Sequence, residues 1–524
     1  MSGESIADDP RHVAPEPAPA PATGGASPSR RPERGERLEL TIESLAYGGE
    51  GIARYGHDGY VVFVAGAVPG DTVQALVYKR KRAYAHARTV ELIEASPERI
   101  PPAADHPGVP WQVLPYPRQL DVKRTQVDDA LRRIGKLDGY TLAPIVPALQ
   151  EWRYRNKLEY SFGAGAAGEL LCGFHAPAGW NRVVQIEDCL LASELGNRAR
   201  RAALAWARAE KLTAWERAAV THDRREDPVD ESAGERADPA ATSRPRGRRD
   251  PAQRTAPADD GRARLRNLVV REGRRTGKLQ VRLVSTPGEL DVEALAQAIA
   301  AEIGAEALSG LLWTRSEALS ESTGGGETEL VWGEQQLPER LCELDLRISP
   351  EAFLQTNTEM AEVLYRIVAE QADLRGFERV YDLYCGTGTI ALSLAGKAGE
   401  LWGVDVVEEA IADAIAAAAR NGIDGARFFA GDARHALPEL LERAGRPDVV
   451  VVDPPRAGLS QRIVRRIIET GPRRIVYVSC NPTTLAPNAA QLGQAGWRLT
   501  SVSPVDMFPQ THHVECVARL DREL

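Results

Sequence analysis

The C-terminal third of the chain alternates regularly between short apolar segments and segments with a helical pattern. From about residue 346 onward, the strand candidates are 380–384, 401–405, 449–452 and 475–479. Such β–α repetition indicates a largely parallel sheet with helices on both faces. We therefore predict a Rossmann-like α/β domain over residues 346–524, with ligands at the carboxyl ends of its strands.

The preceding residues divide into further segments by composition and pattern. Residues 1–36 are rich in Pro, Ala, Gly and Ser and poor in large apolar residues, which predicts a disordered tail. Short alternating runs separated by Gly turns predict a small β-barrel over residues 37–97. Residues 98–345 mix helical and strand patterns and predict an α+β central domain. Within it, residues 214–262 are almost free of large apolar residues, which predicts a disordered insertion in a surface loop.

Charge and cysteine content exclude several classes of protein. The formal charge of -9 at pH 7 is not that of a protein coated with positive charge, so any polyanion site must be local. The six cysteines include no C-x-x-C pair, which argues against a disulfide framework and a zinc knuckle. The sequence has no apolar leader and no apolar run long enough to span a membrane, so we expect a cytoplasmic protein.

A glycine-rich turn follows the first predicted strand of the C-terminal domain. Residues 385–389 read Cys-Gly-Thr-Gly-Thr, in which Gly386 and the second glycine allow a close backbone approach to a ligand. Asp405 ends the next strand, where a carboxylate can bind ribose hydroxyls, and Asp432 follows a third strand, where adenine is often bound. The third glycine of pyrophosphate-binding turns is missing, which favours S-adenosylmethionine over NAD or FAD. Alternatively, Asp382, Asp405 and Asp432 are solvated strand ends and helix caps.

Two further strand ends carry residues suited to chemistry on a pyrimidine. Asp453 ends one strand and is followed by Pro-Pro-Arg456, and Cys480 ends the next strand on the same predicted edge. A thiolate that adds to carbon 6 of uracil makes carbon 5 nucleophilic enough to take a methyl group. The alternative is an inert thiol. Arg456 stands where amino-methyltransferases with a D-P-P motif usually have an aromatic residue, which disfavours methylation of an exocyclic amine.

A carboxylate precedes the last apolar segment of the chain. Glu515 is a candidate base for the carbon 5 proton if its strand folds back beside the strand of Cys480. The alternative is an ordinary surface residue. His512 and His513 could suggest a metal site, but no third ligand is near them in the sequence, so no metal site is predicted.

Four blocks of residues closely resemble the bacterial RNA 5-methyluridine (uracil-C5) methyltransferase family. The blocks are 353–357 (Phe-Leu-Gln-Thr-Asn), 382–388 (Asp-Leu-Tyr-Cys-Gly-Thr-Gly), 453–458 (Asp-Pro-Pro-Arg-Ala-Gly) and 478–482 (Val-Ser-Cys-Asn-Pro) with the trailing Glu515. The resemblance implies that Cys480 is the nucleophile and Glu515 the proton acceptor. It also implies that the S-adenosylmethionine site is lined by Gln355, Tyr384, Asp405 and Asp453. The family usually has Glu at the position of Asp405, and the shorter side chain is compatible with a role at the ribose.

The predicted barrel, which contains Tyr47-Gly-Gly-Glu-Gly51, resembles a TRAM domain, an RNA-binding module of many members of this family. Its last strands carry the basic run Lys79–Arg82, followed by Tyr84, His86 and Arg88. We favour an RNA-binding surface because cations and aromatic rings alternate here. The alternative is a solvated hairpin.

One departure from the family concerns iron. Ribosomal members often hold a [4Fe-4S] cluster through a group of cysteines just after the TRAM barrel and one later cysteine. The corresponding residues 101–112 contain no cysteine, and only Cys189 matches the later ligand. One thiolate cannot hold such a cluster, so no iron–sulfur cluster is expected. Packing around Trp111 and Tyr116 is expected to order this segment instead.

Together these features predict S-adenosylmethionine-dependent methylation of uracil carbon 5 in RNA, on an exposed or flipped uridine. The TRAM-like module favours 23S ribosomal RNA, and transfer RNA stays open as a substrate. RNA cytosine-5 methylation uses the same thiol chemistry, but its enzymes typically lack this terminal Glu. A non-enzymatic RNA-binding protein with a degenerate methyltransferase domain is disfavoured by intact Cys480, Glu515 and Asp453. Neither a membrane nor an obligate protein partner is inferred.

Overall fold

The structure, a computed structural model, describes most of the chain. The described residues are 31–176, 179–216, 261–318 and 323–523. Residues 1–30 of the predicted tail and residues 217–260 of the predicted insertion therefore lie outside the described residues. At the two ends of that insertion, Ala214 forms a backbone bridge with Leu265 and Arg262 forms one with Glu289. No helix within the described ranges is both long and apolar enough to cross a membrane.

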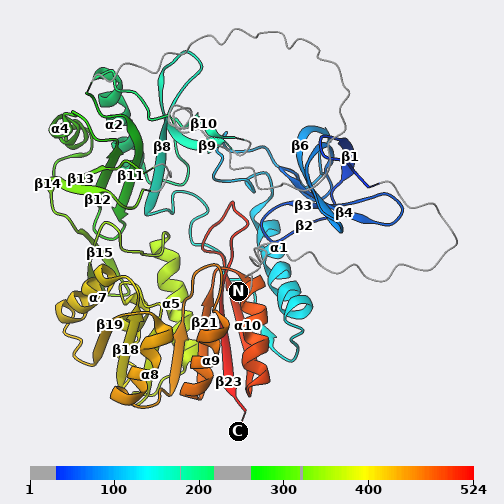
Figure 1. The fold of residues 1–524 in the computed structure, drawn as a ribbon, viewed down its shortest axis with the longest axis vertical. Helices are drawn as coiled ribbons and strands as arrows, with labels where there is room; N and C mark the ends of the chain where they lie inside the picture. Colours follow the sequence, from blue (N-terminus) through cyan, green and yellow to red (C-terminus); the bar gives the residue numbers. More distant parts are fainter. Residues whose placement is uncertain (1–30, 177–178, 217–260, 319–322, 524) are drawn as a thin grey trace, which may run out of the picture.

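Six strands near the N terminus form one sheet in the order β1-β5-β6-β4-β3-β2. They are β1 (Arg37–Thr41), β2 (Ser44–Leu45), β3 (Gly51–Tyr55), β4 (Tyr60–Ala65), β5 (Thr72–Arg80) and β6 (Tyr84–Glu94). Every second residue of β1 is buried, and Leu38 and Leu40 share a core with Val62 and Val64 of β4. We call residues 31–97 the N-terminal β-domain, which is drawn in blue in Figure 1.

The basic run of this domain separates into an exposed part and a buried part. Lys79, Arg80, Lys81 and Arg82 are all exposed around the hairpin between β5 and β6. His86, by contrast, is buried, and its Nδ1 lies 3.1 Å from a carboxylate oxygen of Glu50. His86 is therefore not part of an exposed surface, because its ring packs inside the domain.

The middle of the chain forms a seven-stranded sheet in the order β10-β9-β8-β11-β12-β13-β14. Its strands are β8 (Lys157–Ala164), β9 (Leu170–Ala176), β10 (Gly179–Gln185), β11 (Leu265–Gly273), β12 (Lys278–Ser285), β13 (Leu308–Arg315) and β14 (Glu327–Gly333). Two helices, α2 (Glu194–Ala209) and α4 (Val292–Ile303), pack against each other and share the core of this sheet. Figure 1 shows this middle body in turquoise to green beside the N-terminal β-domain.

The C-terminal sheet has eight strands in the order β19-β18-β17-β20-β21-β23-β22-β7. Its strands are β7 (Thr141–Leu142), β17 (Arg379–Leu383), β18 (Glu400–Asp405), β19 (Ala426–Ala430), β20 (Val449–Val452), β21 (Arg474–Ser479), β22 (Trp497–Val505) and β23 (Glu515–Arg522). The strands from β17 to β21 are parallel, and β23 runs antiparallel between β21 and β22. Four consecutive valines make up β20, all fully buried, as expected for a strand covered on both faces.

Helices cover both faces of this sheet. They are α5 (Thr358–Ala372), α6 (Thr389–Leu394), α7 (Glu408–Arg420), α8 (Ala433–Ala444), α9 (Gln461–Thr470) and α10 (Pro482–Gln494). The first three share one core with the sheet, and the last three share a second core on its other side. The predicted Rossmann-like α/β fold is thereby confirmed, and its strands end together at one edge (Figure 1).

A segment expected in the central domain packs instead on the C-terminal sheet. Helix α1 (Tyr116–Asp129) and the π-helix η1 (Ala130–Ile134) contact α10, and β7 extends the sheet beside β22. The short hairpin of β15 (Leu337–Leu341) and β16 (Leu344–Ile348) also belongs to a core of the C-terminal body. A single division at residue 345 therefore does not separate the middle body from the C-terminal body, since helical periodicity does not reveal which sheet a helix covers.

The loop between β22 and β23, residues 506–514, reaches out of the C-terminal body toward the other two (Figure 1, red). Lys123 of α1 donates to Asp506 at 2.7 Å, and both side chains are fully buried. Its ammonium group also donates to the carbonyl of Phe508 at 3.0 Å. Gln119 and Gln510 exchange two hydrogen bonds of 2.8 and 2.9 Å. The loop is thus anchored to α1 by buried polar contacts.

We expect Lys123→Ala to lower the free energy of unfolding by about 3–5 kcal/mol, because it leaves the buried Asp506 carboxylate without its cation. Urea denaturation of the variant, compared with the exposed control Lys397→Ala, measures the loss. Lys123→Met combined with Asp506→Leu should recover most of it, since an apolar pair needs no counter-charge. Equal stability of the Lys123→Ala and Lys397→Ala proteins would contradict this role of the pair.

Candidate active site

The glycine-rich turn after β17 forms a tight bend at the carboxyl edge of the C-terminal sheet. Tyr384, Gly386 and Gly388 have φ angles of 64°, 53° and 73°. A Cβ atom on Gly388 would lie 2.8 Å from the ring of Phe428, so only glycine fits there. Asp405, at the end of β18, accepts a hydrogen bond from the N–H of Gly386 at 2.9 Å. The turn and the second strand end are therefore held together.

A hollow of about 240 Å³ lies beside this turn, lined in part by Tyr384, Asp405 and Asp432. Asp432 caps α8 through the N–H of Arg434 at 2.9 Å and pairs with the guanidinium of the same residue. The hydrogen bond from Arg434 lowers the pKa of Asp432 to about 2, so this carboxylate is ionised. Asp432 is thus a helix cap, as the alternative interpretation of the sequence predicts. Its carboxylate nevertheless borders the hollow.

Two further acids lie deeper at the same edge. Asp382 is fully buried, and burial together with the charge of Asp453 raises its pKa well above the usual value. Its Oδ2 accepts the N–H of Ala391 at 3.1 Å, while its Oδ1 has no hydrogen-bond partner. Gln355 donates to Asp453 at 3.4 Å, and burial raises the pKa of Asp453 to about 7.

This edge fits S-adenosylmethionine. Asp405 would offer a carboxylate to ribose hydroxyls, and the hollow it borders is lined by both polar and apolar residues, as suits an adenosine. A sulfonium cation offers countercharge to the buried acids Asp382 and Asp453. The unpaired oxygens Asp382 Oδ1 and Thr387 Oγ1 are available for further contacts. The acids would repel the phosphate groups of a dinucleotide, which disfavours a dinucleotide at this edge.

The next strand ends bring Cys480 and Glu515 to the same edge. Strand β23 folds back beside β21, so Ser479 pairs with Cys516 in register and Cys480 and Glu515 are each one residue further along. Cys480 is half-buried and Glu515 is buried. Burial, and then the charge of Glu515, raises the pKa of the Cys480 thiol to about 12. Burial, and then the charge of Asp453, raises the pKa of Glu515 well above its usual range.

Arg456 supplies the positive charge beside Cys480 and Glu515. The D-P-P motif that precedes it in the sequence did not predict this role. The charge of Arg456 lowers the pKa of both Cys480 and Glu515, against the effect of burial. One guanidinium nitrogen lies 3.1 Å from Nε2 of His513. Burial lowers the pKa of His512 to about 4 and that of His513 to about 2, so both rings are neutral. Throughout the described ranges, no three His, Cys, Asp or Glu side chains gather as a metal site would need.

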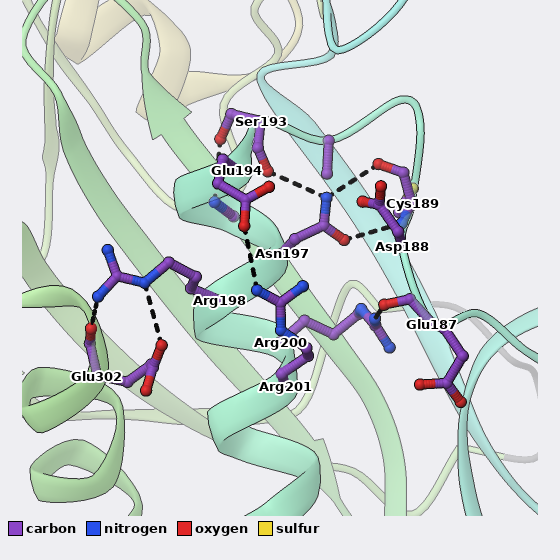
Figure 2. Close-up of polar contacts among 12 residues, drawn as sticks. Glu187, Asp188, Cys189, Ser193, Glu194, Asn197, Arg198, Arg200, Arg201 and Glu302 are labelled. Atoms are coloured by element: carbon purple, nitrogen blue, oxygen red, sulfur yellow. Dashed lines mark hydrogen bonds and ion pairs between the residues drawn. The ribbon is translucent and has the colours of Figure 1, made fainter.

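Cys189 belongs to the core of the middle body and not to this edge. Asn197 of α2 bonds to both the N–H and the carbonyl of Cys189, at 2.9 and 3.0 Å (Figure 2). Its sulfur lies 3.2 Å from Nε2 of His106, a residue of the cysteine-free segment 101–112. Because Nδ1 of His106 accepts the N–H of Gly108, its Nε2 carries the proton and donates to the sulfur.

The segment after the N-terminal β-domain is thus held by more than the two aromatic residues expected to order it. Trp111 is buried in a small core with Leu45 and Val68, and the hydroxyl of Tyr116 accepts the N–H of Ala148 at 2.7 Å. The contact between His106 and Cys189 adds a direct link to the middle body. The sequence gives no local sign of this pair, because its members are 83 positions apart.

Comparisons with known proteins identify the family of the chain. Residues 329–523 match the family model described as tRNA (uracil-5-)-methyltransferase, and residues 31–90 match the TRAM domain. A protein of Bacteroides thetaiotaomicron named as an uncharacterized RNA methyltransferase is 35% identical over 91% of this chain and 100% of its own. One of Halalkalibacterium halodurans with the same description is 33% identical over 92% of this chain and 96% of its own.

A solved structure with the same fold also carries the cofactor product. The tRNA (uracil-54, C5)-methyltransferase of Pyrococcus abyssi, in complex with S-adenosyl-L-homocysteine, is 26% identical to this chain. It matches with a TM-score of 0.67 over 92% of this chain and 100% of its own. The fold and these comparisons together define an S-adenosylmethionine-dependent RNA methyltransferase. Within that class, the chain belongs to the tRNA (uracil-5-)-methyltransferase family and has an N-terminal TRAM domain.

We expect Asp405→Asn to weaken binding of S-adenosylmethionine by about 10- to 100-fold, the loss typical for a hydrogen bond to a charged acceptor. The substitution also weakens the hold of this side chain on Gly386. Isothermal titration calorimetry measures the effect, and the exposed Asp424→Asn is the matched control. An unchanged dissociation constant in Asp405→Asn would remove Asp405 from the cofactor site.

Proposed function

We propose that this protein methylates carbon 5 of uracil in RNA, preferably 23S ribosomal RNA, through a covalent adduct between Cys480 and the base. The observation that carries the proposal is the register of β21 and β23, which brings Cys480 and Glu515 to one edge of the sheet beside Asp453. A nucleophile and a base on adjacent strands can act on the same ring from fixed positions.

In this proposal the Cys480 sulfur, once deprotonated, forms a bond to carbon 6, and the electrons of the C5–C6 double bond move to oxygen 4. S-adenosylmethionine supplies a methyl group made electrophilic by its bond to a sulfonium sulfur. Carbon 5 takes that methyl group, and the electron pair of the broken bond stays on the sulfonium sulfur. Glu515 then accepts the carbon 5 proton, the double bond reforms, and the thiolate of Cys480 leaves.

Neighbouring groups support each of these roles. Arg456 stabilises the anionic forms of Cys480 and Glu515, since its charge lowers the pKa of both. The raised pKa of Glu515 makes it a stronger base once ionised. We further propose that Gln355, Tyr384 and Gly386, together with Asp405, Asp432 and Asp453, hold the methyl donor.

The proposal also concerns which RNA is the substrate and where it binds. The exposed basic run Lys79–Arg82 on the TRAM domain gives an acidic protein a local site for RNA phosphates. We propose that the N-terminal β-domain and the middle body together bind the RNA, and that the protein acts in the cytoplasm. Transfer RNA is the second candidate substrate, favoured by the match to the Pyrococcus abyssi enzyme.

RNA containing 5-fluorouridine tests the mechanism, because fluorine at carbon 5 cannot be removed as a proton and the adduct should persist. We expect the wild-type protein to form a covalent complex with the fluorinated RNA when the methyl donor is present, and Cys480→Ala to form none. Cys342→Ala, which removes another half-buried thiol, is the control. Comparison of 23S ribosomal fragments with transfer RNA in the same assay identifies the substrate. A complex that persists in Cys480→Ala would assign the nucleophile to another residue.

On unmodified RNA, Glu515→Gln should accumulate the methylated adduct and release product slowly, whereas the exposed Glu523→Gln should turn over normally. Normal turnover of Glu515→Gln would exclude Glu515 as the base.

The raised pKa of Cys480 predicts an unusual pH dependence. Below a thiol pKa of about 12, the thiolate fraction grows by about tenfold per pH unit. The single-turnover rate of adduct formation should therefore rise steeply from about pH 7 to 9 and reach no plateau in that range. Arg456→Met should lower the rate at each pH because it removes a cation that stabilises the thiolate, and the exposed Arg462→Met should not. A plateau below pH 8 in the wild-type protein would contradict the assignment.

A further inference from the structure

A loop of the N-terminal β-domain reaches the turn that carries Cys480. This loop, residues 46–50, joins β2 to β3 and is closed by a backbone hydrogen bond of 2.8 Å from the N–H of Ala46 to the carbonyl of Glu50. Near its tip, the hydroxyl of Tyr47 donates to the carbonyl of Cys480 at 2.8 Å. The ring of Tyr47 is half-buried and packs against the core of the C-terminal body. A side chain of the N-terminal β-domain is thus part of the wall around Cys480.

The position of this loop is fixed from two sides. The amide of Gln126 in α1 donates to the carbonyls of Leu45 and Ala46, at 3.1 and 3.0 Å. On the other side, Gly49 lies against His512 of the loop 506–514, where a Cβ atom would come within 3.1 Å of the imidazole ring. Gly49 also has a φ of 88°, which other residues rarely adopt. These contacts leave little freedom for Tyr47 to move.

The hydrogen bond from Tyr47 acts where the chain leaves the sheet. Pairing of β21 with β23 extends to Ser479, and Asn481 already caps α10, so Cys480 lies between two regular elements. Asn481 is tied to the carbonyl of Arg456 at 3.1 Å. A donor on the Cys480 carbonyl fixes the peptide plane after this residue and thereby the direction of its side chain. Burial raises the pKa of Tyr47, so its hydroxyl remains a donor at neutral and moderately alkaline pH.

We propose that Tyr47 is a positioning residue for Cys480, which makes the N-terminal β-domain part of the catalytic centre in addition to its role in holding RNA. The inference rests on the proposed function, because it concerns the residue assigned as nucleophile. It predicts that loss of the Tyr47 hydroxyl slows the attack of the thiol without weakening the hold on RNA.

The N-terminal β-domain contains a matched control. Tyr60 also donates to a backbone carbonyl at 2.8 Å, that of Lys81, but within the N-terminal β-domain. We expect Tyr47→Phe to slow single-turnover adduct formation on saturating 5-fluorouridine RNA by about 5- to 50-fold, because a poorly oriented nucleophile reacts slowly. Tyr60→Phe should react at the wild-type rate. Dissociation constants for RNA and S-adenosylmethionine should stay within about twofold in Tyr47→Phe, as expected when the lost bond lies outside both binding sites.

Two further variants separate positioning from RNA binding and from folding. Replacement of Lys79, Arg80, Lys81 and Arg82 by Ala should weaken RNA binding and flatten its salt dependence, so a higher RNA concentration should relieve its defect. The slower reaction of Tyr47→Phe, by contrast, should persist at saturating RNA. Gln126→Leu, which frees the loop that carries Tyr47, should slow adduct formation in the same direction as Tyr47→Phe while retaining RNA affinity.

Three outcomes would count against the proposal. If wild-type protein formed no adduct, the proposed function and this inference would both fall. If the wild type formed the adduct and Tyr47→Phe formed it equally fast, the inference alone would fall. A loss of RNA affinity in Tyr47→Phe that accounts for its slower reaction would also overturn it, because Tyr47 would then act through binding.

Discussion

The arrangement of the three bodies depends on buried polar contacts made by the loop of residues 506–514. Lys123 of α1 neutralises Asp506 at its start, and Tyr154, just before the first strand of the middle sheet, donates to the carbonyl of Pro509 at 3.0 Å. Because these polar groups are buried, each would be costly to leave unpaired, so the contacts favour one arrangement over all others. Glu515 directly follows this loop. The same contacts therefore determine where β23 begins and which residue of the chain faces the turn of Cys480.

The electrostatic character of the site follows from acids gathered away from water. Asp382, Asp453 and Glu515 come from three different strand ends or starts, and burial raises the pKa of each. Buried acids that repel one another are stabilised by a cation, and the methyl donor of this class of enzyme brings one as its sulfonium. Arg456 acts on the other side, where its charge favours the anionic forms of Cys480 and Glu515. In the proposed mechanism, the sulfonium cation would stabilise the negative charge of Asp382 and Asp453, and Arg456 that of Cys480 and Glu515.

Local patterns predicted the elements and strand ends of the C-terminal domain but not the contacts between distant segments. The predicted strand over 449–452 and the glycine turn after residue 384 were visible because burial and tight turns leave marks in neighbouring residues. The family resemblance, and not periodicity, singled out Glu515, whose placement depends on β23 folding back beside β21. The hydrogen bond from Tyr47 to Cys480 joins residues 433 positions apart, and no local pattern encodes such a contact. For the same reason the chain could be read as carrying a separate central domain up to residue 345, although α1 packs on the C-terminal sheet.

The candidate site is assembled from both ends of the chain. Tyr47 comes from the N-terminal β-domain, whereas Cys480 and Glu515 come from the last 45 residues, and α1 lies between them as the common support through Gln126 and Lys123. Contacts of such long range require the closure of large loops, which costs conformational entropy. If Tyr47 positions Cys480 as proposed, the α/β domain alone has no complete site. The thiol would then be correctly oriented only when the N-terminal β-domain is docked, which would tie the orientation of the proposed nucleophile to the presence of the TRAM domain.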